Sequence, residues 1–111
     1  MVASYVGIED FKKLDIRVGT VVKVERIRRT EKLYKMTIDL GPLGTKQTVA
    51  SLVEYYTPEQ LLGRKVVFLA NLKPAKFGGE VSEGMILTAD YENVVPLLTV
   101  DREVPNGVRV V

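Results

Sequence analysis

Residues 16–27 read IRVGTVVKVERI, and this stretch decides the fold. The β-branched residues that share one parity are Ile16, Val18, Thr20, Val22 and Val24. Val21 and Ile27 fall on the other parity, so both faces of the predicted strand are partly apolar. Gly19 lies inside the strand, where a closed barrel needs a sharp coil or a bulge. The pattern therefore predicts a long strand that bends.

Four further strands are predicted along the chain. Alternation from Leu33 to Leu40 predicts a second strand, whose apolar face holds Tyr34, Met36, Ile38 and Leu40. Residues 41–44 (GPLG) form a turn, and the next strand covers 46–50. The remaining two strands are expected at 65–71, which is almost wholly apolar, and at 85–89. The polar residues 73–83 between them are expected to form a loop.

Two short helices interrupt this pattern. Thr57-Pro58-Glu59-Gln60 offers an N-cap, a proline at the first helical position and a capping-box partner, and Gly63 ends that helix. Ile8, Phe11 and Leu14 recur at helical spacing and predict an N-terminal helix.

Three strands, a short helix and two strands follow the order of the oligonucleotide/oligosaccharide-binding (OB) barrel. We therefore expect an all-β, five-stranded OB-fold barrel in a single domain, with residues 1–14 as an N-terminal helical segment, 15–91 as the barrel and 92–111 as a C-terminal extension. Ligands of this fold meet strands two and three and two loops. Here those loops are residues 28–32 and 72–83.

Cysteine and histidine are both absent. Their absence excludes disulfides, thiolate nucleophiles, sulfur-ligated metals and the usual general base near neutral pH. Carboxylate pairs among the 14 Asp and Glu residues are the remaining catalytic alternative. We expect a protein that is not an enzyme, with no catalytic residue, metal or cofactor. Met1–Lys13 lacks the features of a secretion signal and no apolar run could cross a bilayer, so we expect a cytoplasmic protein.

The net charge of +2 conceals an uneven distribution along the chain. Residues 12–35 hold nine basic residues against three acidic ones, and 64–76 hold four basic residues and no acid. Residues 80–103 hold six acidic residues against Arg102 alone. This asymmetry favours a basic face that binds phosphates, with ordinary solvated strands and loops as the alternative.

The C-terminal extension is rich in apolar residues and is broken by Pro96 and Pro105. A 111-residue monomer would have difficulty hiding all of them. We expect a two-fold homodimer formed through this extension. The alternative is that the extension plugs one end of the barrel.

Four motifs occur in order. They are Asp15-Ile-Arg-Val-Gly19, Lys32-Leu-Tyr34 with Asp39-Leu-Gly41, Asn71-Leu-Lys-Pro74, and Ser82-Glu-Gly-Met85. Together they resemble the tRNA-binding domain family over Glu9–Val111. That family includes the C-terminal domain of bacterial methionyl-tRNA synthetases, the separate β subunit of the archaeal enzyme, free-standing structure-specific tRNA-binding proteins and a domain of a human endothelial monocyte-activating cytokine. The resemblance implies tRNA binding and, as a partner, the catalytic chain of methionyl-tRNA synthetase.

The resemblance also implies a binding pocket. Its members here would be Lys32, Lys46, Asn71, Lys73, Lys76, Ser82, Gly84 and Met85. The lysines suit phosphates, Asn71 and Ser82 can donate to sugars or base edges, and Met85 offers a surface beneath a base. The structural alternatives are a strand cap for Asn71, a turn for Gly84 and a core position for Met85.

The first loop departs from the family pattern. Members often place a His-Pro pair there, whereas this chain has Arg28-Arg29, which we include among the tRNA-binding candidates. Tyr34 is the single aromatic candidate near the expected face, and this shortage argues against a general single-strand binder. Recognition of the shape and backbone of a folded tRNA fits better.

Three other functions compete with tRNA binding. A protein-export chaperone of related fold begins much like residues 10–23, but it diverges from the Asn-Leu-Lys-Pro and Ser-Glu-Gly-Met patterns kept here. A structural adaptor of a synthetase complex is a third possibility. Cytokine signalling is a fourth, for which the sequence shows no sign of the necessary processing.

Overall fold

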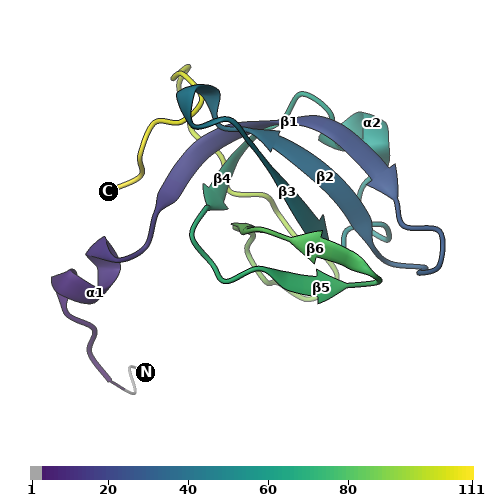
Figure 1. Ribbon diagram of the computed structural model, residues 1–111, viewed down its shortest axis with the longest axis horizontal. Coiled ribbons are helices and arrows are strands. Elements are labelled where there is room, and N and C mark those ends of the chain that lie inside the picture. The colour runs from purple at the N-terminus through teal and green to yellow at the C-terminus, as the bar shows by residue number, and fades with distance from the viewer. Residues whose placement is uncertain (1–3) are drawn as a thin grey trace.

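The computed structural model describes residues 4–111, so residues 1–3 of the predicted N-terminal segment lie outside the described residues. Five strands form one antiparallel sheet in the order β3-β2-β1-β4-β7. They are β1 (Ile16–Arg26), β2 (Tyr34–Asp39), β3 (Thr45–Ala50), β4 (Lys65–Leu69) and β7 (Met85–Ile86). Because the outermost strands β3 and β7 also contact each other, the sheet curls into a nearly closed barrel (Figure 1). The predicted all-β, OB-like barrel is confirmed.

The long strand β1 bends as its sequence predicts. Its register with β2 shifts between Val21 and Lys23, which is the irregularity of a β-bulge. Two residues earlier, Gly19 lies so close to β2 that a Cβ atom there would come 2.7 Å from Ile38 Cγ2 and 2.9 Å from Leu40 Cδ2. Glycine is therefore required at this point for β1 and β2 to approach.

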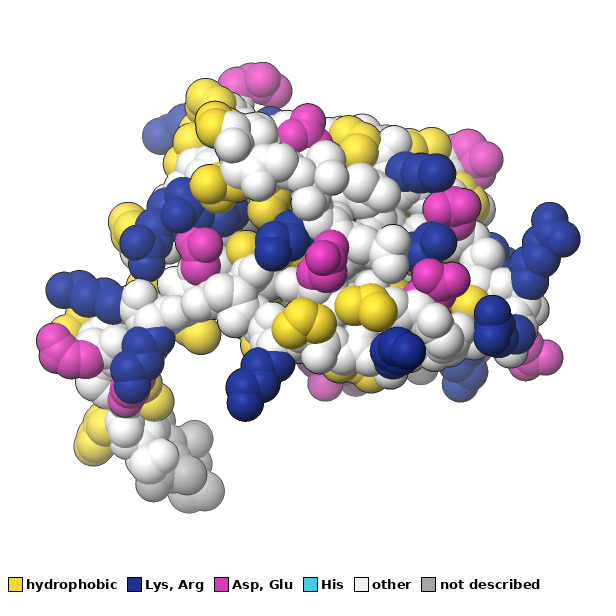
Figure 2. Space-filling view, in the orientation of Figure 1, with side chains coloured by type: hydrophobic (Ala, Val, Ile, Leu, Met, Phe, Trp, Pro, Cys, Tyr) yellow, Lys and Arg dark blue, Asp and Glu magenta, His cyan; other side chains and the backbone are white. Residues whose placement is uncertain are grey.

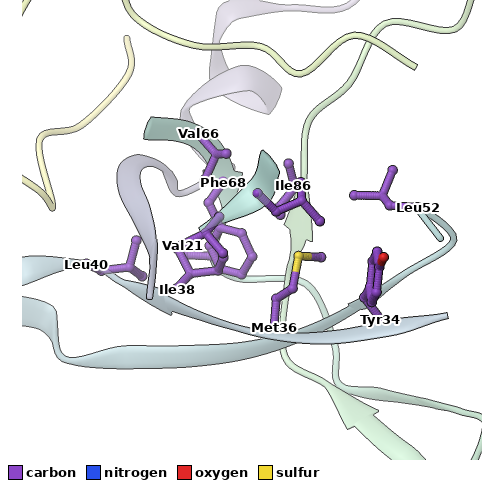
Figure 3. Packing of buried hydrophobic residues seen from close by; sticks show 11 residues of the cluster. Val21, Tyr34, Met36, Ile38, Leu40, Leu52, Val66, Phe68 and Ile86 are labelled. Atoms are coloured by element: carbon purple, nitrogen blue, oxygen red, sulfur yellow. The ribbon is translucent and has the colours of Figure 1, made fainter. Parts of the chain in front are cut away.

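The main core fills the barrel interior (Figure 3). The alternating face of β2 supplies Tyr34, Met36, Ile38 and Leu40, all of which are buried. Val21, Val66, Phe68 and Ile86 meet them from β1, β4 and β7. Burying a side chain of this size removes roughly 2 kcal/mol of unfavourable apolar hydration, so this layer supplies much of the driving force for folding.

A second, smaller apolar cluster lies on the outer side of the barrel. Ile16, Val67 and Leu69 are buried there against Leu87 and Val110. The C-terminal extension is held over them by backbone bonds from Val18 N to Val108 O (2.9 Å), Gly107 N to Val18 O (2.7 Å) and Val110 N to Ile16 O (2.8 Å). This cover explains why β4 is apolar on both faces. The extension thus packs on its own barrel, while Val94, Leu98, Val108 and Val111 stay exposed.

The helices match their predictions. α2 (Pro58–Leu61) begins after Thr57, with both bonds of the capping box in place: Gln60 N donates to Thr57 Oγ1 (3.3 Å) and Thr57 N donates to Gln60 Oε1 (2.8 Å). α1 (Ile8–Lys12) is also a helix, but none of its residues is buried. In the described part of the chain, no helix has the length and apolarity required to span a bilayer.

Three local expectations need correction. The predicted turn 41–44 contains a short 3-10 helix, η1 (Gly41–Leu43). The fifth strand, expected to reach residue 89, ends at Ile86. Beyond it, Leu87 N still donates to Val67 O of β4, and Leu87 O accepts from Leu98 N, where the extension joins the sheet. The predicted loop 73–83 contains a hairpin, β5 (Ala75–Phe77) and β6 (Glu80–Ser82).

The close approach at Gly19 yields a stability prediction. Gly19→Ala should lower the free energy of unfolding by about 1–3 kcal/mol, because the added methyl overpacks the contact with Ile38 and Leu40. Urea unfolding followed by circular dichroism measures the loss. Gly7→Ala is the matched control, since nothing lies within 4 Å of a Cβ there. Equal stability of the two variants would contradict the conclusion that β1 and β2 require a glycine at position 19.

Candidate nucleic-acid interface

Two loops predicted to bind the ligand meet each other at their tips. The β5–β6 hairpin turns at Gly78 and Gly79, which both have positive φ angles (59° and 83°). A Cβ on Gly78 would lie 2.9 Å from Thr30 Cγ2, and one on Gly79 would lie 3.1 Å from the Arg29 guanidinium. The loop between β1 and β2 is itself held by the Thr30 hydroxyl, which donates to Ile27 O (3.0 Å) and accepts from Leu33 N. The two loops therefore form one continuous surface, which Figure 1 shows to the right of and below β2 and β3.

The hairpin is also fastened to the edge strand β3. Gln47 N donates to Glu83 Oε1 (2.8 Å), Glu83 N donates to Gln47 O (2.8 Å), and Gln47 Nε2 donates to Val81 O (2.8 Å). These bonds hold β6 beside β3, so the hairpin has a defined place relative to the barrel.

The predicted cations are unpaired, and five of the six belong to the two loops that form this surface. Arg28, Arg29, Lys32, Lys73 and Lys76 are exposed, and Lys46 at the start of β3 is half-buried. Within residues 4–111 none of these six side chains has an acidic partner within 4.0 Å. Figure 2 shows Lys and Arg side chains around the hairpin and the neighbouring loop, with acidic side chains among them. The unpaired cations are therefore free to meet phosphates.

Lys35 behaves differently from these six. Its ammonium lies 3.4 Å from Glu80 Oε1 and 3.8 Å from Glu25 Oε1. These ion pairs join β2 to the hairpin and to β1, so Lys35 belongs to the support of the surface.

A hollow of about 200 Å³ opens between the hairpin and β3. Its lining consists of Val49, Leu72, Lys73, Ala75, Phe77, Ser82, Gly84 and Met85. Four of these were predicted from the sequence, and the structure brings them together. The prediction missed Phe77, whose side chain is 49% exposed at the hollow. Its position in a predicted loop concealed it, although the following Gly-Gly pair is a hairpin signal.

Asn71 and Ser82 are already hydrogen-bonded within the protein. The Asn71 side chain accepts from Asp15 N and donates to Lys13 O (both 2.8 Å), which ties the N-terminal segment to the end of β4. Ser82 is buried, and its hydroxyl accepts from Val49 N (3.1 Å) and donates to Gly84 O (3.0 Å). These contacts are structural, and a role of either side chain in holding RNA stays a prediction.

Gly84 forms the floor of the hollow. A Cβ there would lie 2.5 Å from both Leu69 O and the Phe68 ring. The absence of a side chain is therefore required for the chain to pass over the core at this point.

The expectation that Tyr34 lies on the binding face is wrong. Its side chain is 4% exposed, and its hydroxyl donates to Tyr56 O (2.7 Å). Figure 3 shows the ring among the core residues. Tyr34 cannot stack on a base, and Phe77 is the aromatic side chain that the hollow presents.

The described residues contain no group of three or more acidic side chains placed to hold a metal ion. The surface combines unpaired cations with a small apolar hollow that Lys73 lines, and this combination suits an anionic ligand with flat apolar parts.

Comparison with known proteins agrees with this chemistry. Residues 16–109 match the family model described as "Putative tRNA binding domain". A methionine–tRNA ligase of Archaeoglobus fulgidus is 51% identical over 105 residues, which are 95% of this chain and 16% of that protein. The chain thus spans about one-sixth of the length of the curated relatives it matches.

Solved structures of two kinds share the fold. A MetRS related protein from Pyrococcus horikoshii has a TM-score of 0.89 and 40% identity, covering 96% of this chain and 98% of that one. The chaperone CsaA of Bacillus anthracis has a TM-score of 0.88 and 35% identity, covering 97% of this chain and 100% of that one.

The contacts of Ser82 yield a prediction that separates structure from binding. Ser82→Ala should lower the free energy of unfolding by about 1–3 kcal/mol, because the half-buried Val49 N–H loses its acceptor. Thermal unfolding measures the effect, and Ser51→Ala at an exposed position is the control. A variant as stable as the control would show that the hydroxyl does not hold the hairpin.

Proposed function

The chain belongs to the tRNA-binding domain family, and from that premise we propose that it binds folded tRNA through the surface described above and catalyses no reaction itself. The observation that carries this proposal is that unpaired cations from two separate loops lie on one continuous surface, where Lys73 lines an apolar hollow. Arg28, Arg29 and Lys32 come from the loop between β1 and β2, and Lys73 and Lys76 come from the β4–β6 region. No cofactor enters the proposal.

The physical basis is the phosphate backbone of RNA. Each cation that neutralises a phosphate releases condensed counterions, so binding is attractive but weakens as salt rises. The cations are spread over two loops, and a folded RNA presents its phosphates over a comparably broad surface. The arrangement supports recognition of tRNA shape with little sequence preference.

We further propose that the chain serves methionyl-tRNA synthetase, either as its β subunit or as a trans-acting partner, in the cytoplasm. Support comes from the relatives, which are named methionine–tRNA ligases and which extend well beyond this domain. A domain that binds tRNA beside a catalytic domain raises the effective concentration of tRNA there without adding a catalytic group.

Salt-dependent binding tests the proposal. Filter binding with bulk tRNA at several salt concentrations should show affinity that falls as salt rises. Lys73→Ala should weaken binding and reduce the salt slope by roughly one, because one phosphate contact is lost. Arg102→Ala removes an exposed charge far along the chain and serves as the matched control. The proposal would be wrong if tRNA did not bind, or if affinity were independent of salt.

A peptide-binding export chaperone is the second candidate function. The likeness to CsaA and the apolar lining of the hollow favour it. Lys73 at the hollow and the unpaired cations around it favour an anionic ligand instead. Competition decides between the two: a chaperone would release bound tRNA when an unfolded polypeptide is added and would prefer the polypeptide at high salt.

We also propose the homodimer expected from the C-terminal extension. Exposed apolar side chains support it, because the end of the extension and α1 together line an apolar hollow of about 330 Å³. Ile8 (64% exposed) and Phe11 (37% exposed) lie there beside Val110 and Val111. A second copy related by a two-fold axis would cover both elements at once.

Sedimentation velocity tests the dimer. Phe11→Asp should shift a wild-type dimer to monomer, because a carboxylate would be buried in an apolar interface, and no residue of α1 is fully buried within its own chain. Leu62→Asp, at a position 47% exposed after α2, is the control and should leave the dimer intact. A monomeric wild-type protein would refute this part of the proposal.

A further inference from the structure

Large apolar side chains are exposed around the hollow between the hairpin and β3. Leu72 is 41% exposed, Phe77 is 49% exposed and Met85 is 46% exposed. By contrast, Phe68 is completely buried in the core of the same barrel. Exposed apolar side chains gathered around one concave site mark a place where a ligand covers them.

The hollow is preformed. Phe77 lies on β5, paired with Glu80 on β6, and the adjacent hairpin turn packs on Thr30. The Ser82 hydroxyl fixes the other end of β6 to β3 through Val49 N. Because Gly84 has no side chain, its backbone can lie directly against the Phe68 ring at this side of the hollow. Binding therefore requires little reorganisation of these walls.

The size and charge of the hollow limit its occupant. Its volume of about 200 Å³ lies below the roughly 300–1,000 Å³ of sites for drug-sized ligands, so it suits a single ring system. Lys73 is among the lining residues and no acidic side chain is. An aromatic ring, a thioether and an aliphatic side chain beside an ammonium match a flat base joined to a phosphate.

We propose that this hollow takes one unpaired nucleobase of the bound tRNA, stacked on Phe77, with Lys73 on the adjoining phosphate. The inference rests on the proposed tRNA binding and adds to it a specific feature of the RNA, namely an unstacked nucleotide in a loop or at a bulge. A duplex holds its bases in the stack and offers none to the hollow. The six cations then orient the folded RNA, and Phe77 selects for the presence of an accessible base.

Fluorescence provides a direct test, because the chain contains no tryptophan. The indole of a Phe77→Trp variant would be the only one in the protein and would stack on the base. Bulk tRNA and an RNA hairpin with an unpaired loop should quench its emission. A blunt RNA duplex of equal length should bind more weakly and leave the emission unchanged.

Affinity provides the second measurement. Phe77→Ala should weaken tRNA binding about tenfold, in line with the loss of one base–aromatic contact, and should leave the salt slope unchanged. Phe77→Tyr should restore most of the affinity. Tyr91→Ala removes another exposed aromatic ring (64% exposed) that does not line the hollow, and it should bind as the wild type does. Thermal unfolding checks that each variant is folded.

The outcomes separate the two proposals. If wild-type protein binds tRNA with the expected salt dependence but Phe77→Ala matches it, or if the duplex quenches the indole equally, the base pocket is overturned and tRNA binding stands. If wild-type protein binds no tRNA, both fail. If an apolar peptide quenches the indole and tRNA does not, the hollow is a peptide site and the inference is overturned.

Discussion

The closure of the barrel between β3 and residues 82–84 is the constraint on which the functional surface depends. β3 is an edge strand on this side, and its N–H groups need acceptors that no regular neighbour supplies. Ser82 Oγ accepts from Val49 N and Glu83 Oε1 accepts from Gln47 N, while the Thr48 hydroxyl donates to Gly84 O (2.9 Å). Side chains of one short segment thus complete the edge. The same bonds hold the hairpin in place, and the hollow lies between the hairpin and the edge that they join.

The barrel was predictable because its strands obey simple periodicity. The alternation of β2 identified its buried face correctly, and the Thr57–Gln60 capping box identified the helix start. Both signals act within a few residues, where local physics decides the conformation. The sequence also showed that β1 is apolar on both faces, but it did not show what covers the outer face. The cover is the C-terminal extension, which packs on Ile16 although it lies over 90 positions away along the chain.

The candidate site was predictable in its charges but less so in its aromatic group. Tyr34 was assigned both to the apolar face of β2 and to the binding face, although alternation permits one only, and the core takes it. Phe77 was overlooked because each hairpin strand has three residues, too few to show a period. The Ser-Glu-Gly-Met motif located the hollow, yet three of its members, Ser82, Glu83 and Gly84, take part in barrel closure. A motif can therefore mark the position of a binding site while its own residues hold the surrounding structure and neighbouring residues contact the ligand.

The balance of charge explains why a basic surface needs an apolar hollow. The acidic stretch after residue 80 is not confined to the opposite face, because Glu80 pairs with Lys35 inside the basic region. The six predicted cations are unpaired, and if each neutralised one phosphate, affinity would fall about a thousandfold between 50 and 200 mM salt. Stacking on an aromatic ring is not screened by salt in this way. A single base held on Phe77 would therefore supply a part of the binding free energy that does not fall with salt. It would do so without selecting a particular base, since every base has a π-face.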